Sequence, residues 1–291
     1  MREEASFTDD HGVVIHHYRW QAAQPRAVVQ LVHGLGEYAT RYEQWGVIPA
    51  LVAAGYTVVA EDHRGHGATG LEQWKGDHSR LGRLGPGGWR AAVEDVRRLS
   101  VLARARDPEL PLVLFGHSLG SIMAQEIIGT DDGSGAMAYD AVVLSGTAYR
   151  SLRQMNSGDL NKRHAALGPT TAEWLSRDRA VVDAFAADPL TFEADVLKLF
   201  GVVDGLRLLG TPHRLQKDLP MYIVIGEEDP LGGPHSVELL ARAYGERGGL
   251  SDVTLTIYPG ARHEVFNETN RVEVITDLLT WLGQRLPERP R

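Results

Sequence analysis

Gly116-His117-Ser118-Leu119-Gly120 is the stretch that decides the fold of this chain. It follows an apolar run, residues 111–115, and precedes a helix-favouring stretch, residues 121–128. A serine between two glycines at such a junction is typical of a sharp turn from a strand into a helix, which holds the serine Oγ above the edge of a sheet. The five residues alone are common enough to occur in any loop. The flanking strand and helix patterns favour a nucleophilic Ser118.

A nucleophilic serine needs a base and an acid, and the downstream chain offers both after apolar strand patterns. Three consecutive acids follow residues 221–226, and His263 closes the loop after residues 253–258. The chain order serine, acid, histidine is that of the α/β-hydrolase triad. In that fold all three side chains lie on loops at the carboxyl ends of parallel strands, so we expect them to meet there.

The same rule selects the acid. Asp140 and Asp252 precede their strands and would lie at the opposite end of the sheet. Among the three acids that follow a strand, Asp229 is favoured because its short side chain, followed by a proline, suits a fixed loop position. Glu227 and Glu228 remain alternatives.

The oxyanion hole is expected at a second loop. His33-Gly34-Leu35-Gly36 follows the strand pattern of residues 28–32, and an α/β-hydrolase carries one oxyanion-hole amide at this place. We therefore expect the Leu35 N–H to be one donor and the N–H of Leu119, the residue after the serine, to be the other. The His33 side chain is expected to brace the loop.

Strand and helix patterns alternate along the chain, which predicts an α/β fold with a mainly parallel central sheet and helices on both faces. The first strand is expected at residues 13–20. Amphipathic surface helices are expected at residues 42–54, 88–106 and 271–285. No internal repeat is visible.

Longer strings around these motifs resemble one protein family. They are His33–Ala39 with Arg41–Glu43, Asp62–Gly67 and Tyr258–Glu264. These strings are similar to the monoacylglycerol lipase and lysophospholipase group of α/β-hydrolases. The resemblance covers the core of the chain, from about Val13 to Leu282, and fails only in the middle. It implies a serine ester hydrolase that needs no metal and no organic cofactor.

Two residues depart from the pattern of that group. Ala68 stands where a serine often follows the glycine turn, and Ser121 where a further glycine often follows the elbow. Neither position belongs to the triad or to the oxyanion amides. The departures therefore concern packing and specificity, and leave the expected reaction class unchanged.

A long insertion separates the strand patterns of residues 141–145 and 221–226, and such insertions are usually functional. We expect residues 1–146 and 212–291 to form the hydrolase core and residues 147–211 to form a helical cap, or lid, called the cap segment below. Its apolar residues either pack onto the core or line a tunnel for an acyl chain, and both can hold for different faces. They are Trp174, Leu175, Val181, Val182, Phe185, Phe192, Val196, Leu197, Phe200 and Val203.

Composition agrees with an enzyme and excludes several other classes. The 291 residues, 43% of them hydrophobic, suffice for one large α/β core. A net charge of −8 without a basic cluster gives no support for nucleic-acid binding, and the lack of cysteine excludes disulfides and thiolate metal sites. The start, Met1-Arg2-Glu3-Glu4, is charged and lacks the apolar run of a signal peptide. We therefore expect a cytoplasmic protein.

These features predict hydrolysis of lipid-type carboxylic esters, with a monoacylglycerol as the leading substrate and Ser118 as the residue that is acylated. A carboxylesterase for other small esters, a lysophospholipase and a peptidase that releases N-terminal residues are alternatives on the same triad, and a haloperoxidase-like side activity would need no new residue. A dehalogenase is disfavoured because its elbow carries a carboxylate. A pure binding module is disfavoured because every triad and oxyanion position is filled. The expected partners are a small-molecule or lipid ester and, transiently, a lipid surface that the cap segment touches.

Overall fold

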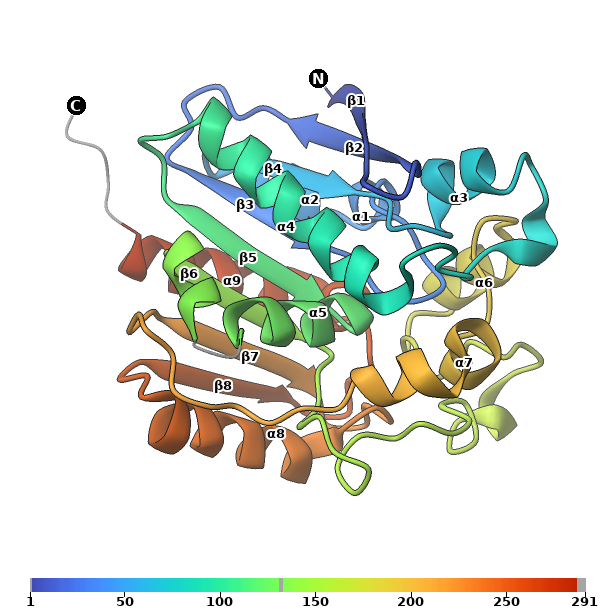
Figure 1. Cartoon of the computed structure of the whole chain (residues 1–291). Coiled ribbons are helices and arrows are strands. Elements are labelled where there is room, and N and C mark those ends of the chain that lie inside the picture. Colours follow the sequence, from blue (N-terminus) through green and yellow to red (C-terminus); the bar gives the residue numbers. More distant parts are fainter. Residues whose placement is uncertain (1, 131–132, 287–291) are drawn as a thin grey trace.

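Figure 1 shows a computed structural model of the chain, which describes residues 2–130 and 133–286. The strands are β1 (Arg2–Thr8), β2 (Val14–Trp20), β3 (Ala27–Val32), β4 (Tyr56–Glu61), β5 (Leu112–His117), β6 (Ala141–Ser145), β7 (Met221–Gly226) and β8 (Val253–Tyr258). The helices are α1 (Arg41–Gln44), α2 (Val47–Ala53), α3 (Gly67–Gln73), α4 (Gly88–Arg106), α5 (Leu119–Ile128), α6 (Arg179–Ala187), α7 (Val196–Arg207), α8 (Gly233–Ala243) and α9 (Arg271–Arg285). Short 3-10 turns lie at His78–Arg80, Ser134–Ala138, Ala165–Leu167 and Val265–Asn267, and a π-helical turn covers Tyr244–Gly248.

Within the described residues, the strands form one eight-stranded sheet in the order β1-β2-β4-β3-β5-β6-β7-β8. β2 pairs antiparallel with both β1 and β4, whereas the strands from β4 to β8 in this order run parallel. The prediction of an α/β-hydrolase fold with a mainly parallel sheet is therefore confirmed. Because parallel strands end at the same edge, the loops after β3, β5, β7 and β8 gather there.

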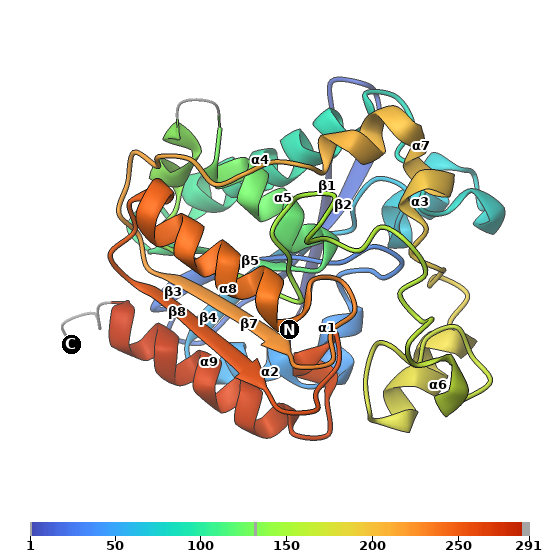
Figure 2. The same ribbon diagram turned by 90° about the horizontal axis from the view of Figure 1, so that it is seen from below.

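Successive side chains of each central strand enter two different cores, one on each face of the sheet. On β5, Leu112 and Leu114 pack in a cluster with residues of α4, α5 and α8, while Val113 and Phe115 pack with residues of α2 and α9. Figure 2 shows these two layers of helices on opposite sides of the strands. Covered faces explain why β5, β6 and β7 are apolar along most of their length.

The first strand differs from the expectation. β2 lies where the opening strand was expected, but β1 precedes it at the edge of the sheet. β1 pairs with β2 alone, and most of its residues are exposed. An exposed edge strand needs no alternating apolar pattern, and charges such as Glu3 and Glu4 protect it from pairing with other chains. The hydrophobic pattern therefore gave no sign of it.

The single helix expected at residues 42–54 is also wrong, because the structure has two short helices there. Gly46 lies between them with a φ of 103°, which no helical residue adopts. The amphipathic pattern is nevertheless meaningful, since Val47, Ile48 and Leu51 of α2 are buried.

The cap segment contains α6 and α7, joined to the core by turns and irregular chain. Gly201 interrupts α7 with non-helical dihedral angles (φ 76°, ψ 177°). In Figure 1 the arrowheads of β5, β7 and β8 point toward the side of the molecule where α6 and α7 lie. Of the helices in the described ranges, none combines the length and the apolar character needed to cross a membrane.

Candidate active site

Ser118 lies at a strained turn between β5 and α5. Its backbone has φ 51° and ψ −120°, a conformation that residues with a side chain rarely adopt. A Cβ on Gly116 would lie 2.4 Å from the carbonyl oxygen of Gly120, and a Cβ on Gly120 would lie 2.0 Å from that of Val32. The Ser118 N–H donates to the Ser145 carbonyl at 2.9 Å. The turn has the geometry of a nucleophile elbow, in which only glycines fit on either side of the serine.

His263 and Asp229 meet from the loops after β8 and β7. Nδ1 of His263 lies 2.9 Å from Oδ1 of Asp229, and both side chains are buried. Burial lowers the pKa of His263, but the Asp229 carboxylate, aided by Glu264 and Glu37, more than offsets this, so that the pKa lies above its ordinary value of 6.5. Nε2 of His263 is buried and has no hydrogen-bond partner among the described residues. It is therefore available to accept a proton from a hydroxyl.

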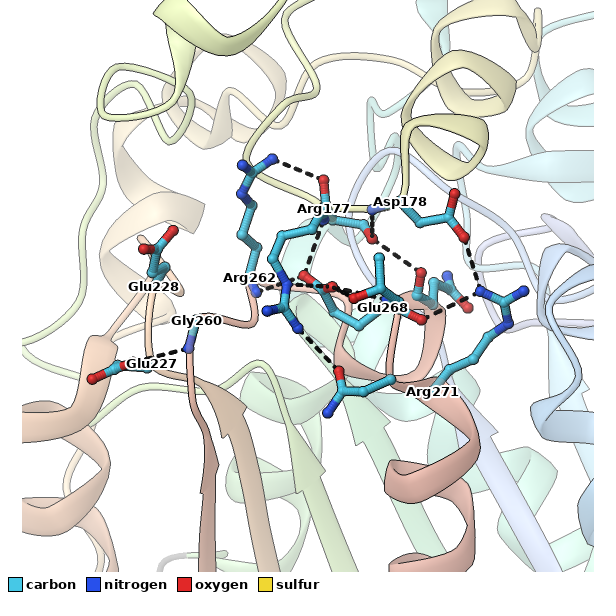
Figure 3. Close-up of polar contacts among 12 residues, drawn as sticks. Arg177, Asp178, Glu227, Glu228, Gly260, Arg262, Glu268 and Arg271 are labelled. Atoms are coloured by element: carbon cyan, nitrogen blue, oxygen red, sulfur yellow. Dashed lines mark hydrogen bonds and ion pairs between the residues drawn. The ribbon is translucent and has the colours of Figure 1, made fainter.

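The two alternative acids lie elsewhere. Glu227 accepts a hydrogen bond from the N–H of Gly260 at 2.9 Å (Figure 3). Glu228 is partly exposed and faces Nε2 of His164 in the cap segment at 3.5 Å. Of the three consecutive acids, Asp229 is the one that contacts the histidine.

One expected oxyanion residue follows β3 and the other follows β5. Leu35 and Leu119 line the same cavity as Ser118. Within residues 2–130 and 133–286, neither the N–H of Leu35 nor that of Leu119 donates a hydrogen bond to the protein. Two unpaired N–H groups beside a nucleophile are what an oxyanion requires.

Side chains fix both peptide groups of Gly34. Nδ1 of His33 donates to the Gly34 carbonyl at 2.8 Å, and Nε2 of His33 accepts from the N–H of His63 at 3.0 Å. The Glu37 carboxylate accepts from the Gly34 N–H at 2.7 Å. The Gly34 carbonyl and the Leu35 N–H belong to one planar peptide group, so His33 braces the loop, as expected, and orients this amide.

A buried ion-pair network joins this loop to the histidine loop, and the sequence reasoning assigned it no role. Arg41 donates to Glu37 at 3.0 Å and to both carboxylate oxygens of Glu264 at 2.7 and 3.0 Å, and all three side chains are buried. The hydroxyl of Tyr42 also donates to Glu37. These residues stand in the strings that carry the family resemblance. Nothing local in those strings signals that Arg41 meets a residue 223 positions away.

A cavity of about 280 Å³ opens beside Ser118. Its lining is mostly aliphatic, comes from both the core and the cap segment, and includes no charged side chain. It consists of Leu35, Ser118, Leu119, Ile122, Leu152, Met155, Asn156, Ser157, Gly158, Leu160, Ala194, Val196, Leu197, Val202, Gly205, Leu206, Leu208, Leu209 and Leu231. Such a lining suits an apolar ligand chain.

The apolar residues singled out in the cap segment divide between the two roles considered for them. Val196 and Leu197 line the cavity, whereas Trp174, Leu175 and Val182 pack in a cluster of their own. No group of three or more His, Cys, Asp or Glu side chains in the described part of the chain is arranged to hold a metal ion.

Comparison with known proteins assigns the chain to a family. Residues 23–270 match the family described as serine aminopeptidase, S33. The chain belongs to this family. This member of the serine aminopeptidase family is 33% identical to a monoacylglycerol lipase of Mycolicibacterium smegmatis over 98% of both chains. It is 29% identical to the monoglyceride lipase of Homo sapiens over 90% of this chain and 84% of that one.

Solved structures agree with the assignment. A thermostable carboxyl esterase from Bacillus coagulans, crystallised in complex with glycerol, is 25% identical with a TM-score of 0.82, and the match covers 98% of this chain and 99% of that one. A soluble variant of the monoglyceride lipase from Saccharomyces cerevisiae, in complex with a substrate analog, has the same fold, with 21% identity and a TM-score of 0.77 over 98% and 96% of the two chains. The chain is therefore an α/β-hydrolase enzyme, and it resembles monoacylglycerol lipases, as predicted.

Proposed function

We propose that the enzyme hydrolyses monoacylglycerols to a fatty acid and glycerol through an acyl-enzyme on Ser118. The observation that carries the proposal is the uncharged, mostly aliphatic cavity that opens beside Ser118 and can take an acyl chain. The similarity to a monoacylglycerol lipase over 98% of both chains adds support.

In the proposed mechanism His263 is the general base. Asp229 holds the imidazole with Nδ1 protonated, so that Nε2 takes the hydroxyl proton as Ser118 attacks the ester carbonyl. Burial disfavours the imidazolium that forms, and the Asp229 carboxylate offsets this effect. The base is therefore strong enough to hold the proton until the alcohol leaves.

The N–H groups of Leu35 and Leu119 bind the oxyanion that develops on the carbonyl oxygen. Loss of one such donor typically costs about 3 to 4 kcal/mol, roughly a hundred- to thousandfold in rate. The protonated His263 then gives its proton to the departing glycerol oxygen. In the second half of the reaction it activates a water molecule, which hydrolyses the acyl-enzyme.

Residues 147–211 are the cap in this proposal, and residues 1–146 with 212–291 are the hydrolase core. Most of the cavity lining comes from the cap, which makes this segment the place where acyl-chain length is selected. The proposal thus separates the reaction, which belongs to the core, from the choice of substrate.

The mouth of the cavity is apolar as well. Leu152, Leu197, Val202 and Leu206 line the cavity and are also 55–74% exposed. Exposed apolar side chains around a binding site favour contact with a hydrophobic partner. A transient contact between the cap and a lipid surface would let a monoacylglycerol pass directly into the cavity.

The experiment that tests the function is hydrolysis of monoacylglycerols from short to long chains. Lysophospholipids, p-nitrophenyl esters and amino-acid p-nitroanilides serve as comparison substrates, and Ser118→Ala as the control. We expect a preference for monoacylglycerols that disappears in Ser118→Ala. Turnover of p-nitrophenyl esters alone would indicate another carboxylesterase, turnover of anilides a peptidase, and folded protein without any turnover a binding module.

A cytoplasmic location is also part of the proposal. Fractionation of the native cells with an antibody against the protein would test it. Recovery of the protein outside the cytoplasmic fraction would contradict it.

A further inference from the structure

Residues 173–178 of the cap segment are bound to the loop that carries His263. The N–H of His263 donates to the Trp174 carbonyl at 3.3 Å, and the N–H of Glu264 donates to the Leu175 carbonyl at 2.8 Å. The Arg262 guanidinium donates to the carbonyls of Glu173 and Ser176 at 2.7 and 2.9 Å. We call residues 173–178 the cap base, because they contact the catalytic loop of the core directly.

One buried carboxylate joins the cap base to this loop. Glu268 is fully buried, and its Oε1 accepts the backbone N–H groups of Arg177 at 3.0 Å and of Arg262 at 2.8 Å. Its Oε2 accepts from Nε of Arg177 at 2.8 Å and from the N–H of Thr269 at 3.0 Å. Figure 3 shows Glu268 between Arg177 of the cap base and Arg262 of the histidine loop.

These contacts depend on the charge of Glu268. All four groups that face the carboxylate within 3.0 Å are N–H donors, and a buried carboxylate is tolerated only when it is paired in this way. An amide in its place would turn its NH₂ group toward two of these donors. The shape would be kept, but half of the hydrogen bonds would be lost.

The cap base also touches the imidazole itself. The ring of Trp174 lies 4.6 Å from that of His263, centroid to centroid, with 39° between the planes. This ring contact and the backbone hydrogen bond to Trp174 together limit how His263 can move. Glu268 holds the segment from which both contacts come.

We propose that Glu268 is a positioning residue for the base: its carboxylate ties the cap base to the histidine loop and so keeps the His263 imidazole between Asp229 and Ser118. The inference rests on the proposed function, in which His263 is the base. It divides the cap segment into a fixed part, residues 173–178, and a part that shapes the acyl site.

The test compares Glu268→Gln with the wild type by the rate at which a fluorophosphonate labels Ser118, and by kcat and KM for a p-nitrophenyl ester. Labelling needs the triad but no particular substrate. We expect the labelling rate and kcat to fall about ten- to hundredfold, because displacement of a catalytic group by about 1 Å has effects of this size. KM should change little, since Glu268 does not line the acyl cavity.

The pH profile separates positioning from a general loss of structure. The charged or titratable groups that act on His263 are Asp229, Glu264, Glu37 and His117. Only the Asp229 contact should loosen in Glu268→Gln, while the ring stays buried, so the acid limb of the labelling rate should move to lower pH. If Glu268→Gln merely unfolds in part, less of the protein will be labelled, but the acid limb of the labelling rate will stay at the wild-type pH. That result would contradict the proposal.

Arg177→Ala keeps the inference testable if Glu268→Gln folds poorly, and the double variant tests whether the two residues act together. Arg177→Ala removes one donor of the partly exposed Arg177 and should show a smaller effect of the same kind. If both residues act through one contact, the effects of the two changes in the double variant should be less than additive. If the two effects on the labelling rate are fully additive, the two residues do not act through one contact.

Asp140→Asn is the matched control. Its carboxylate likewise accepts a backbone N–H, from Leu112, and an arginine, Arg104, but it lies at the opposite end of the sheet. Its labelling rate should stay within about twofold of the wild type. Equal labelling rates for wild type and Glu268→Gln would overturn the positioning role alone. A wild type that is labelled but does not turn over monoacylglycerols would overturn the proposed substrate alone.

Discussion

Ser118 has a backbone conformation that suits the proposed nucleophile and costs stability. Its φ of 51° is one of the two positive values found outside glycine in the described residues. Such conformations cost about 1 to 3 kcal/mol and persist where the surroundings enforce them. Here the enforcing groups are the two close glycines and the hydrogen bond to Ser145.

We expect Ser118→Gly and Ser118→Ala to be equally inactive but unequally stable. Removing the nucleophile should lower kcat by about 10⁴- to 10⁶-fold in both. Glycine relieves the strain that alanine keeps, so Ser118→Gly should have a free energy of unfolding about 1 kcal/mol above that of Ser118→Ala. Urea unfolding of the two variants measures the difference, and equal stabilities would show that the turn is unstrained.

The activity should rise with pH through one ionisation above pH 6.5. Below its pKa His263 is protonated and cannot take the Ser118 proton, so activity is lost as pH falls. Burial lowers the pKa of His263, and Asp229, Glu264 and Glu37 together raise it by more, which sets the acid limb of kcat/KM above pH 6.5. In Asp229→Asn burial acts without that carboxylate, so the limb should move down and kcat should drop about 10⁴-fold. A wild-type limb below pH 6.5 is the result that would count against this assignment.

At the scale of elements, local sequence signals were sufficient for much of the fold. β6, β7, β8, α4 and α9 begin and end at the expected residues. β6 and β7 are mostly continuous apolar runs, β8 alternates apolar residues with threonines, and the two helices have an apolar repeat of 3.6 residues. Such patterns are set within a short window of sequence. The loops that hold Asp229 and His263 were predictable for the same reason, because they follow β7 and β8, and Ser118 follows the equally apolar run of β5.

Features fixed by distant contacts could not be predicted in this way. β1 lacks an apolar face because it is an exposed edge, and the break between α1 and α2 rests on the backbone of one glycine. Glu268 meets Arg177 from 91 positions away, and its surroundings in sequence look like an ordinary turn before α9. A single sequence contains no signal for such a contact.

Glycines at the elbow and on an open helix surface should respond in opposite directions to alanine. Gly120→Ala places a Cβ 2.0 Å from a backbone oxygen and should lower the free energy of unfolding by about 1 to 3 kcal/mol, with loss of activity. Gly283→Ala on α9 meets nothing within 4 Å and should raise it by about 0.5 to 1 kcal/mol with activity unchanged. Thermal unfolding together with esterase assays distinguishes the two. An active, stable Gly120→Ala would refute the elbow geometry.

At the scale of the whole molecule, the two faces of α7 differ in their surroundings. One face lines the cavity beside Ser118, while Val203 is 66% exposed and lies outside that lining. An exposed apolar residue next to the mouth of the site fits an enzyme that takes its substrate from a lipid surface.

Val203→Glu should weaken binding to monoacylglycerol-containing vesicles about tenfold, because burying one valine contributes roughly 1.5 kcal/mol. Hydrolysis of a short, water-soluble ester should not change. Val272→Glu on α9 is the matched control, since Val272 is also exposed, at 76%, but lies on a different helix. Vesicle flotation measures the binding. Equal losses of binding in the two variants would show that the added negative charge, and not the position on α7, weakens it.

The hydrogen bonds between residues 174–175 and 263–264 also set the limits for building chimeras. A cap transplanted from a relative between residues 147 and 211 would bring a foreign peptide against the His263 imidazole. An exchange restricted to α6 and α7, residues 179–207, leaves the native peptide in place. Engineers who wish to change the proposed acyl preference without losing turnover should therefore cut the gene inside the insertion, after residue 178.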